Sequence, residues 1–340
     1  MRVDAFNHFF PKKYYERMGE IGAGLKDMFN RTRAIPAIYD LDERFRVIDK
    51  FPDYCQVLSL PAPRLEMVSR GDPKSAEELA KIGNDGLAEL VAKYPDRFPA
   101  FVAQTPMIAG DAGVAETVRA IKELGAVGTQ IYTNVGGKPL DRPEFEPFFA
   151  AMHKLDKPIW LHPDRPATHP DYLDEKKSLY EIWWTFGWPY ETSVAMARLV
   201  FSKIMDKYPG LKIITHHLGA MVPYFEGRVG PGWDQLGART TDEDYVSLRK
   251  NLKKRPLDYF KDFYADSAVF GSKPATECGL AFFGIDHVVF ASDSPFDPEK
   301  GPGYIRETIK IIDGLKITKE ERAKLYYKNL EKLTGKKFVK

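Results

Sequence analysis

Eight short apolar runs recur along this 340-residue chain, and helical patterns separate most of them. The runs are rich in β-branched or aromatic residues, which is typical of fully buried parallel strands. Alternation of strands and helices predicts right-handed crossovers and a parallel sheet. Eight such strands favour a (β/α)₈ TIM barrel formed by residues 1–340 as a single domain. The runs are RVDAF near Val3, CQVLSL near Val57, FPAFVA near Phe101, AVGTQIY near Thr129, PIWL near Trp160, KIIT near Ile213, FYADS near Ala265 and HVVFAS near Val289.

The helical segments carry recognisable start and stop signals. The segment SAEELAKIGNDGLAELVAKYP opens with Ser75 and Glu78, which are spaced as in a capping box, and it stops at Pro95. The segment DAGVAETVRAIKELG begins near Asp111 and ends at Gly125, a residue type that favours helix C-termini. These signals support the predicted order of alternating strands and helices.

Two stretches exceed a minimal barrel. Residues 12–52 follow the first strand, and residues 164–190 follow the fifth and contain EIWWTFGWPY. We expect both to be inserted loops on the side of the barrel where loops line the active site. The aromatic content predicts walls or a lid for an apolar or planar substrate. A hydrophobic dimer surface is an equal alternative for Trp183 and Trp184.

Composition excludes several classes of partner. The 50 Lys and Arg residues nearly balance the 48 Asp and Glu residues, giving a net charge of +2, so no nucleic-acid partner is expected. No apolar run approaches the roughly 18 residues of a membrane span. The opening MRVDAFNHFF enters a strand almost at once and leaves no room for a signal peptide. Only Cys55 and Cys278 are present, which favours a reduced, cytoplasmic protein.

Four metal-type side chains each follow a different predicted strand: His8, His162, His217 and Asp293. The C-terminal strand ends of a TIM barrel meet at the active-site mouth. Neutral imidazole is a common zinc ligand, and a carboxylate at the end of an apolar strand needs a partner such as a metal ion. The alternatives are a satisfied loop histidine at position 8, a structural histidine at 162 and a helix N-cap at 293. Asp297 is better placed for that capping role.

Strand alternation predicts how neighbouring side chains point. His8 follows Phe6 by two residues, so both should face the same way, and Asn7 should point outward unless a bulge intervenes. His216 and His217 are adjacent, so only one imidazole can face the mouth if both residues keep strand geometry. The other would be a packing residue or would support the site from outside.

Four segments in order resemble the amidohydrolase-related family (amidohydrolase 2) of the aminocarboxymuconate-semialdehyde decarboxylase type. They are WLHP, GWPYETSVAMARLVFS, YPGLKIITHHLGAMVPYFEGR and FASDSPFD, and the resemblance extends over nearly the whole chain. It implies a (β/α)₈ barrel with one divalent metal, zinc or manganese, and a homodimer. It also implies a decarboxylase, hydratase or hydrolase of small carboxylated, often aromatic or ring-derived compounds.

The resemblance assigns roles to matching residues. His8, His162 and Asp293 match the metal ligands, and His217 matches the general acid/base, with Asp293 sharing in catalysis. Phe6 stands where the family has another metal ligand. Three protein ligands plus solvent are still a normal open catalytic site, and the alternative is that the metal is lost or binds weakly.

A second departure concerns the substrate. Ala220 stands where hydroxybenzoate-type decarboxylases of this group often carry a glutamate, which argues against direct transfer of that reaction. Arg165 could bind a second substrate carboxylate through its fork, or could be a surface charge. Phe6, Trp183 and Trp184 are further candidates for substrate contact.

Three functions follow, in decreasing order of support. The first is a metal-dependent decarboxylase of a small carboxylated aromatic or ring-derived acid, in which the metal stabilises developing charge and His217 or Asp293 delivers a proton. The second is a hydrolase of a lactone or amide, which uses a metal-activated water at the same site. The third is a non-catalytic binding barrel, which would predict scattered loss of site residues.

Overall fold

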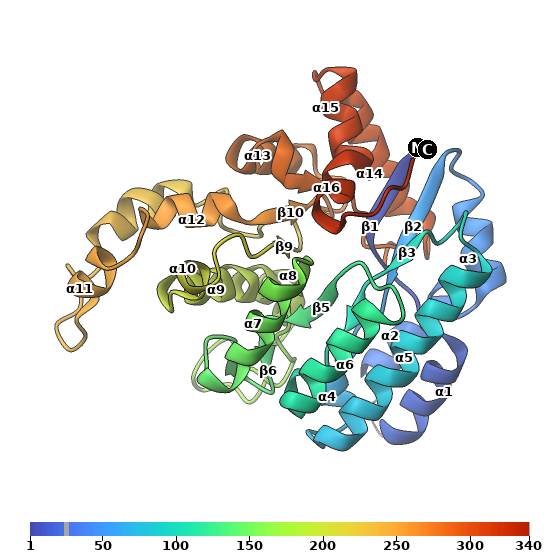
Figure 1. The fold of residues 1–340 in the computed structure, drawn as a ribbon, viewed down its shortest axis with the longest axis horizontal. Helices are drawn as coiled ribbons and strands as arrows, with labels where there is room; N and C mark the ends of the chain where they lie inside the picture. Colours follow the sequence, from blue (N-terminus) through green and yellow to red (C-terminus); the bar gives the residue numbers. More distant parts are fainter. Residues whose placement is uncertain (24–26, 340) are drawn as a thin grey trace.

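The computed structural model describes residues 1–23 and 27–339, and all eight predicted strands form within it. Figure 1 shows the strands gathered at the centre of the molecule with helices packed around them. The predicted run near Phe101 forms two short pieces rather than one strand. The strands are β1 (Arg2–His8), β2 (Tyr54–Ser59), β3 (Ala100–Phe101), β4 (Ala103–Gln104), β5 (Thr129–Tyr132), β8 (Ile159–His162), β9 (Ile213–Thr215), β10 (Tyr264–Asp266) and β11 (Val288–Val289).

Parallel pairing arranges the strands in a closed circle. The two sheets have the orders β1-β2-β3 and β11-β10-β9-β8-β5-β4, and every neighbouring pair in them is parallel. β3 is the last strand of the first sheet and β4 the last strand of the second. Only Val102 lies between them in the chain, so the two sheets are continuous there. The backbone N–H of Ala5 donates to Phe290 O at 2.8 Å, and that of His8 donates to Ser294 O at 2.9 Å, which joins β1 to the chain at β11. The predicted TIM barrel is therefore confirmed.

Helices follow most strands and cover the outside of the barrel (Figure 1). A short β6–β7 hairpin (Asn134–Val135 and Lys138–Pro139) adds to the loops after β5. The helices are α1 (Lys12–Ile21), α2 (Asp27–Arg33), α3 (Leu41–Ile48), α4 (Leu65–Val68), α5 (Pro73–Lys93), α6 (Asp111–Lys122), α7 (Glu146–Leu155), α8 (Ile182–Thr185), α9 (Gly187–Phe201), α10 (Ile204–Lys207), α11 (Tyr245–Lys250), α12 (Pro256–Asp262), α13 (Lys273–Phe283), α14 (Pro302–Gly314), α15 (Lys319–Ala323) and α16 (Asn329–Thr334).

The start of α5 differs from the prediction. Its N-cap is Asp72, whose carboxylate accepts the backbone N–H of Ser75 at 2.9 Å, and Pro73 occupies the first helical position. The capping box predicted from Ser75 and Glu78 is therefore wrong. A proline with its fixed φ is well suited to begin a helix, so the helix starts three residues earlier than a cap at Ser75 would place it.

Both predicted insertions are present, and a third was not predicted. Residues 12–52 hold α1, α2 and α3, and residues 164–190 form turns and α8. A further excursion, residues 228–250, follows β9 and includes α11, which Figure 1 shows projecting away from the barrel. Across residues 1–23 and 27–339, no helix is both long and apolar enough to cross a membrane.

Side chains fill the barrel interior. One cluster of buried apolar residues includes Val3 and Phe6 from β1, Val57 from β2 and Trp160 from β8. The Trp160 indole N–H donates to the carbonyl of Ala5 at 3.1 Å, which ties β8 to β1. A larger cluster packs the helices against the outside of the strands. The interior is thus solid, and the chemistry is confined to the mouth.

Candidate metal centre

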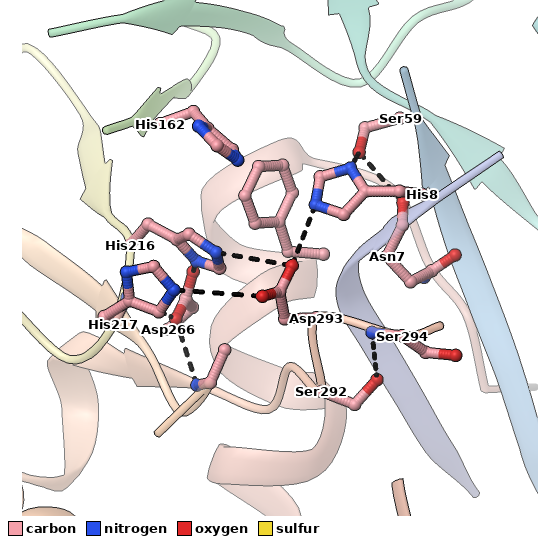
Figure 2. A network of polar contacts seen from close by, with 12 residues as sticks. Asn7, His8, Ser59, His162, His216, His217, Asp266, Ser292, Asp293 and Ser294 are labelled. Atoms are coloured by element: carbon pink, nitrogen blue, oxygen red, sulfur yellow. Dashed lines mark hydrogen bonds and ion pairs between the residues drawn. The ribbon is translucent and has the colours of Figure 1, made fainter. Parts of the chain in front are cut away.

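Histidine and aspartate side chains from four strand ends converge at the mouth of the barrel. His8 and His162 are the last residues of β1 and β8, His216 and His217 follow β9, and Asp293 follows β11. Figure 2 shows the Asp293 carboxylate between the imidazoles of His8, His216 and His217. All four residues singled out from the sequence therefore lie together, and His216 joins them.

Both adjacent histidines face the site. β9 ends at Thr215, and His217 has a φ of 55° with Leu218 at 54°, which is the left-handed region. The backbone turns there, and the two imidazole centroids lie 3.7 Å apart. The sequence predicts a single inward imidazole only if both residues keep strand geometry, and that condition is not met, because β9 ends before the pair begins.

Three imidazoles of the cluster, those of His8, His162 and His216, are oriented from outside through their Nδ1 atoms. A hydrogen-bond partner at Nδ1 fixes the ring and turns the other nitrogen, Nε2, inward. The Nε2 atoms of His8 and His216 are buried and face the Asp293 carboxylate. The Nδ1 distances are 3.0 Å to Ser59 Oγ for His8, 2.7 Å to Pro163 O for His162 and 2.5 Å to Asp266 Oδ2 for His216.

Asp293 approaches three of the histidines. Its Oδ1 lies 3.0 Å from His8 Nε2 and 3.6 Å from His216 Nε2, and its Oδ2 lies 3.8 Å from His217 Nε2. A ring nitrogen from each of His8, His162 and His216 lies within 4.8 Å of the other two, and His216, His217 and Asp293 form a second such group. Donor atoms this close and this buried fit a divalent cation of the kind held by imidazole and carboxylate.

Burial and charge oppose each other in this cluster. Burial lowers the pKa of His8 and of His162, which favours the neutral, ligating form. Burial alone would raise the pKa of Asp293, but contacts with His216, His217 and His8 outweigh it and hold the pKa well below its ordinary range. Burial lowers the pKa of His216, yet Asp266 and Asp293 outweigh it and raise the pKa to about 9. The two carboxylates thus make this position favourable for a positive charge, whether a proton or a metal ion.

Phe6 lies within the cluster rather than at its edge. The ring is fully buried and meets His8 and His216 edge to face, with centroid distances of 4.8 and 4.7 Å. The Asn7 amide turns away and donates to Val57 O at 3.0 Å. The predicted orientation of Phe6, His8 and Asn7 is confirmed, although the register of β1 against β2 does shift between Asp4 and Asn7.

The prediction that Asp297 is a helix N-cap is wrong, because the N-cap of α14 is Gly301. The Asp297 carboxylate accepts the backbone N–H groups of Gly301 at 2.8 Å and Gly303 at 3.0 Å, at the start of α14. Asp293 therefore does not bind the backbone N–H groups at the start of α14.

A cavity of about 260 Å³ opens beside the cluster. His162, His217 and Asp293 lie on its side next to the cluster, and Ala220 is also part of the wall. The volume lies near the lower end for small-molecule pockets, which span roughly 300–1,000 Å³. The remaining wall includes Arg31, Trp184, Trp188, Phe270, Phe296 and Tyr304.

The four residues suggested for substrate contact fall in different places. Trp184 lines the cavity, whereas Trp183 packs against Trp188 with ring centroids 5.6 Å apart. Phe6 lies beneath the histidines and is not part of the cavity wall. Arg165 lies outside the cavity, and its guanidinium binds Glu191 Oε1 at 3.2 Å and a backbone carbonyl.

Sequence reasoning missed the cation of the cavity, Arg31. It belongs to α2 in the first insertion, and its guanidinium carbon lies 5.5 Å from the Trp184 ring and 5.0 Å from the Phe296 ring. Within the described part of the chain, no carboxylate forms an ion pair with it. No motif marks Arg31, whereas Trp188 does lie in the distinctive GWPY segment.

Comparisons with known proteins agree with this geometry. Residues 3–335 match the model of the family described as Amidohydrolase. Gamma-resorcylate decarboxylase from Polaromonas sp. is 32% identical over 303 residues, which cover 86% of this chain and 86% of that protein. The 2-amino-3-carboxymuconate-6-semialdehyde decarboxylase of Dictyostelium discoideum is 29% identical, with 91% of this chain and 86% of that protein covered.

One solved structure places a ligand and a metal in the same fold. It is the 5-carboxyvanillate decarboxylase of Novosphingobium aromaticivorans with bound manganese and 3-methoxy-4-hydroxy-5-nitrobenzoic acid. It superposes with a TM-score of 0.81 at 25% identity, and the match covers 99% of this chain and 97% of that one. The similarity therefore includes the inserted loops as well as the barrel strands.

Proposed function

This chain belongs to the amidohydrolase family, as the sequence segments predicted, and we propose that it is a metal-dependent decarboxylase of a small aromatic or ring-derived carboxylic acid. The observation that carries the proposal is the cluster of buried imidazoles around Asp293, which opens directly into an aromatic-walled cavity. The decarboxylase activity of the relatives favours a lyase over a hydrolase.

The donor set fits a divalent ion, zinc or manganese. His8, His162 and Asp293 would hold it, as the family resemblance implies, and the buried Nε2 of His8, 3.0 Å from Asp293 Oδ1, supports this assignment. When bound, the ion supplies positive charge next to the cavity, which stabilises the negative charge that develops as carbon dioxide leaves.

His217 and Asp293 are the proposed proton-handling pair. His217 lines the cavity, and its Nε2 lies 3.8 Å from Asp293 Oδ2. The carbon–carbon bond to the carboxyl group breaks, its electron pair stays on the substrate carbon, and a proton from His217 bonds to that carbon. Asp293 has a low pKa, so its anionic carboxylate orients the imidazole and stabilises the protonated form.

The cavity supports an aromatic substrate with an acidic substituent. Trp184, Trp188 and Phe296 offer flat apolar faces to a ring. Arg31 contributes a guanidinium that no described carboxylate neutralises, so a carboxylate or phenolate of the substrate would satisfy it. Arg31 therefore takes the anchoring role that the sequence suggested for Arg165.

Decarboxylation is tested by measuring released carbon dioxide from metal-loaded protein. The panel contains 2,6-dihydroxybenzoate, 5-carboxyvanillate and 2-amino-3-carboxymuconate semialdehyde, with lactones and amides assayed in parallel. We expect turnover of at least one acid, loss of turnover in His162→Ala, and normal turnover in His153→Ala, which removes an exposed histidine of α7. Hydrolysis of a lactone or amide without carbon dioxide release would refute the proposal.

We also propose that residues 1–340 act as one catalytic domain, as a homodimer, in the cytoplasm. Exposed apolar side chains near the mouth support a self-association surface, and both cysteines are free, as in a reducing compartment. Light scattering after gel filtration should give twice the 38.7 kDa chain mass, and cell fractionation tests the location. The exposed side chains are Tyr172, Leu173, Tyr180, Phe186, Tyr190 and Tyr224.

A further inference from the structure

His216 is positioned like a metal ligand rather than a packing residue. Asp266 Oδ2 lies 2.5 Å from its Nδ1, which is the carboxylate–imidazole arrangement that orients histidine ligands in metalloproteins. Asp266 is itself fixed, because its other oxygen accepts the backbone N–H groups of His217 at 3.1 Å and Ala268 at 3.0 Å. The ring of His216 therefore has one orientation, with Nε2 turned toward the cluster.

The inward nitrogen of His216 makes no hydrogen bond, although it lies near the Asp293 carboxylate. This Nε2 atom is buried, 3.6 Å from Asp293 Oδ1. A ring nitrogen of His8 and one of His162 lie within 4.8 Å. Two nitrogens bound to one zinc at about 2.0–2.1 Å are separated by no more than about 4.2 Å, so a small inward closure completes the site.

Phe6 leaves the first strand with one donor fewer. Two residues of β1, Phe6 and His8, face inward near the mouth. Only His8 can bind a metal ion, because the Phe6 ring carries no ligand atom. That ring meets His216 edge to face, with an interplanar angle of 89°. The same contact places the Phe6 ring directly against the His216 imidazole.

We infer that His216 supplies the metal ligand that Phe6 removes from β1, so that three imidazoles and Asp293 bind the ion. The inference rests on the proposed function only in requiring a divalent ion at the mouth. Imidazole donors suit zinc, whereas manganese suits sites rich in carboxylate and water, so this set favours zinc. His217 remains free in the cavity for proton transfer.

The adjacent histidines provide matched variants for the test. His216→Asn and His217→Asn each remove one imidazole of the pair. Zinc affinity is measured by chelator competition, and the visible spectrum of the cobalt-substituted protein reports the donor set. Loss of an outer partner alone typically weakens binding 10–100-fold, so we expect at least a ~100-fold loss and a changed spectrum for His216→Asn. His217→Asn should keep both the affinity and the spectrum.

Restoring a donor on β1 tests the compensation directly. Adding Phe6→His to His216→Asn should recover most of the lost zinc affinity. If His216→Asn fails to fold, Asp266→Asn retains the ligand but frees its ring, and we expect a roughly 10–100-fold weaker zinc site. Unchanged zinc affinity in His216→Asn, or equal losses in His216→Asn and His217→Asn, would overturn the inference while leaving the proposed function intact. Wild-type protein that binds no divalent metal would overturn both.

Discussion

The turn that brings both histidines to the mouth depends on a glycine of α13. A Cβ atom added at Gly279 would lie 1.9 Å from Leu218 Cδ2 and 2.3 Å from its Cγ. Real Cβ contacts do not fall below 3.0 Å, so the Leu218 side chain and α13 would have to move apart by at least 3.0 − 1.9 = 1.1 Å. Leu218 is 2% exposed and directly follows His217, so we expect part of that movement to reach the site.

Gly279→Ala should therefore lower both stability and activity. Overpacking of a buried position costs about 1–3 kcal/mol, and a misplacement of about 1 Å at a reacting group costs roughly 100-fold in rate. Urea unfolding of metal-free protein gives the change in unfolding free energy, and decarboxylation of the best panel substrate gives the change in kcat/KM. The unfolding free energy and kcat/KM thus report independently on the displacement caused by the added Cβ atom.

An exposed helical glycine is the control for this change. Gly19 lies within α1, and a Cβ there would meet nothing within 4 Å. Gly19→Ala should stabilise the protein by about 0.5–1 kcal/mol, because alanine loses less backbone entropy on folding. A steric clash at Gly279 would be contradicted if Gly279→Ala had the wild-type urea midpoint of unfolding. It would also be contradicted if both variants shifted that midpoint in the same direction.

Three further predictions concern the cavity, the metal and a buried carboxyl group. Arg31→Met should raise KM for the acid substrate at least ~10-fold, because a charged hydrogen bond contributes about 1.5–3 kcal/mol; an unchanged KM would contradict the anchoring role. Dialysis against a chelator should abolish decarboxylation and added zinc or manganese should restore it, whereas activity that survives metal removal would contradict a metal centre. Burial raises the pKa of Asp4 from 3.8 to about 6, so the folded chain holds that proton more tightly than the unfolded chain. The contribution of the Asp4 carboxyl group to the unfolding free energy should therefore fall by about 3 kcal/mol as pH rises from about 4 to about 6. Urea titrations of Asp4→Asn at several pH values should lack this part of the pH dependence.

The barrel could be predicted because its signals are local. Strands buried on both faces appear as short apolar runs, and each predicted run lies at or next to a strand of the structure. The ends of those strands share one mouth, so His8, His162 and Asp293 could be grouped before their distances were known. The side chains at the C-terminal ends of the strands could therefore be identified from the sequence.

Positions outside regular structure could not be predicted in this way. Alternation assigned opposite faces to His216 and His217, but a left-handed φ at a histidine is uncommon and has no local pattern. Arg31 reaches the cavity from an insertion whose path over the barrel depends on packing rather than on periodicity. The sequence therefore could not predict that His216, His217 and Arg31 all face the site.

Phe6 shows why a missing ligand cannot be judged one position at a time. Compared only with its counterpart in related proteins, Phe6 suggests a weakened or lost metal site. In the barrel, however, β1 and β9 are separated by β11 and β10, and their side chains meet only through the centre of the mouth. A donor lost from one strand can therefore be replaced from a strand that is distant both in sequence and around the sheet. Whether a degenerate motif has lost its metal depends on the donors that converge in space, and here His216 occupies the place next to the phenyl ring.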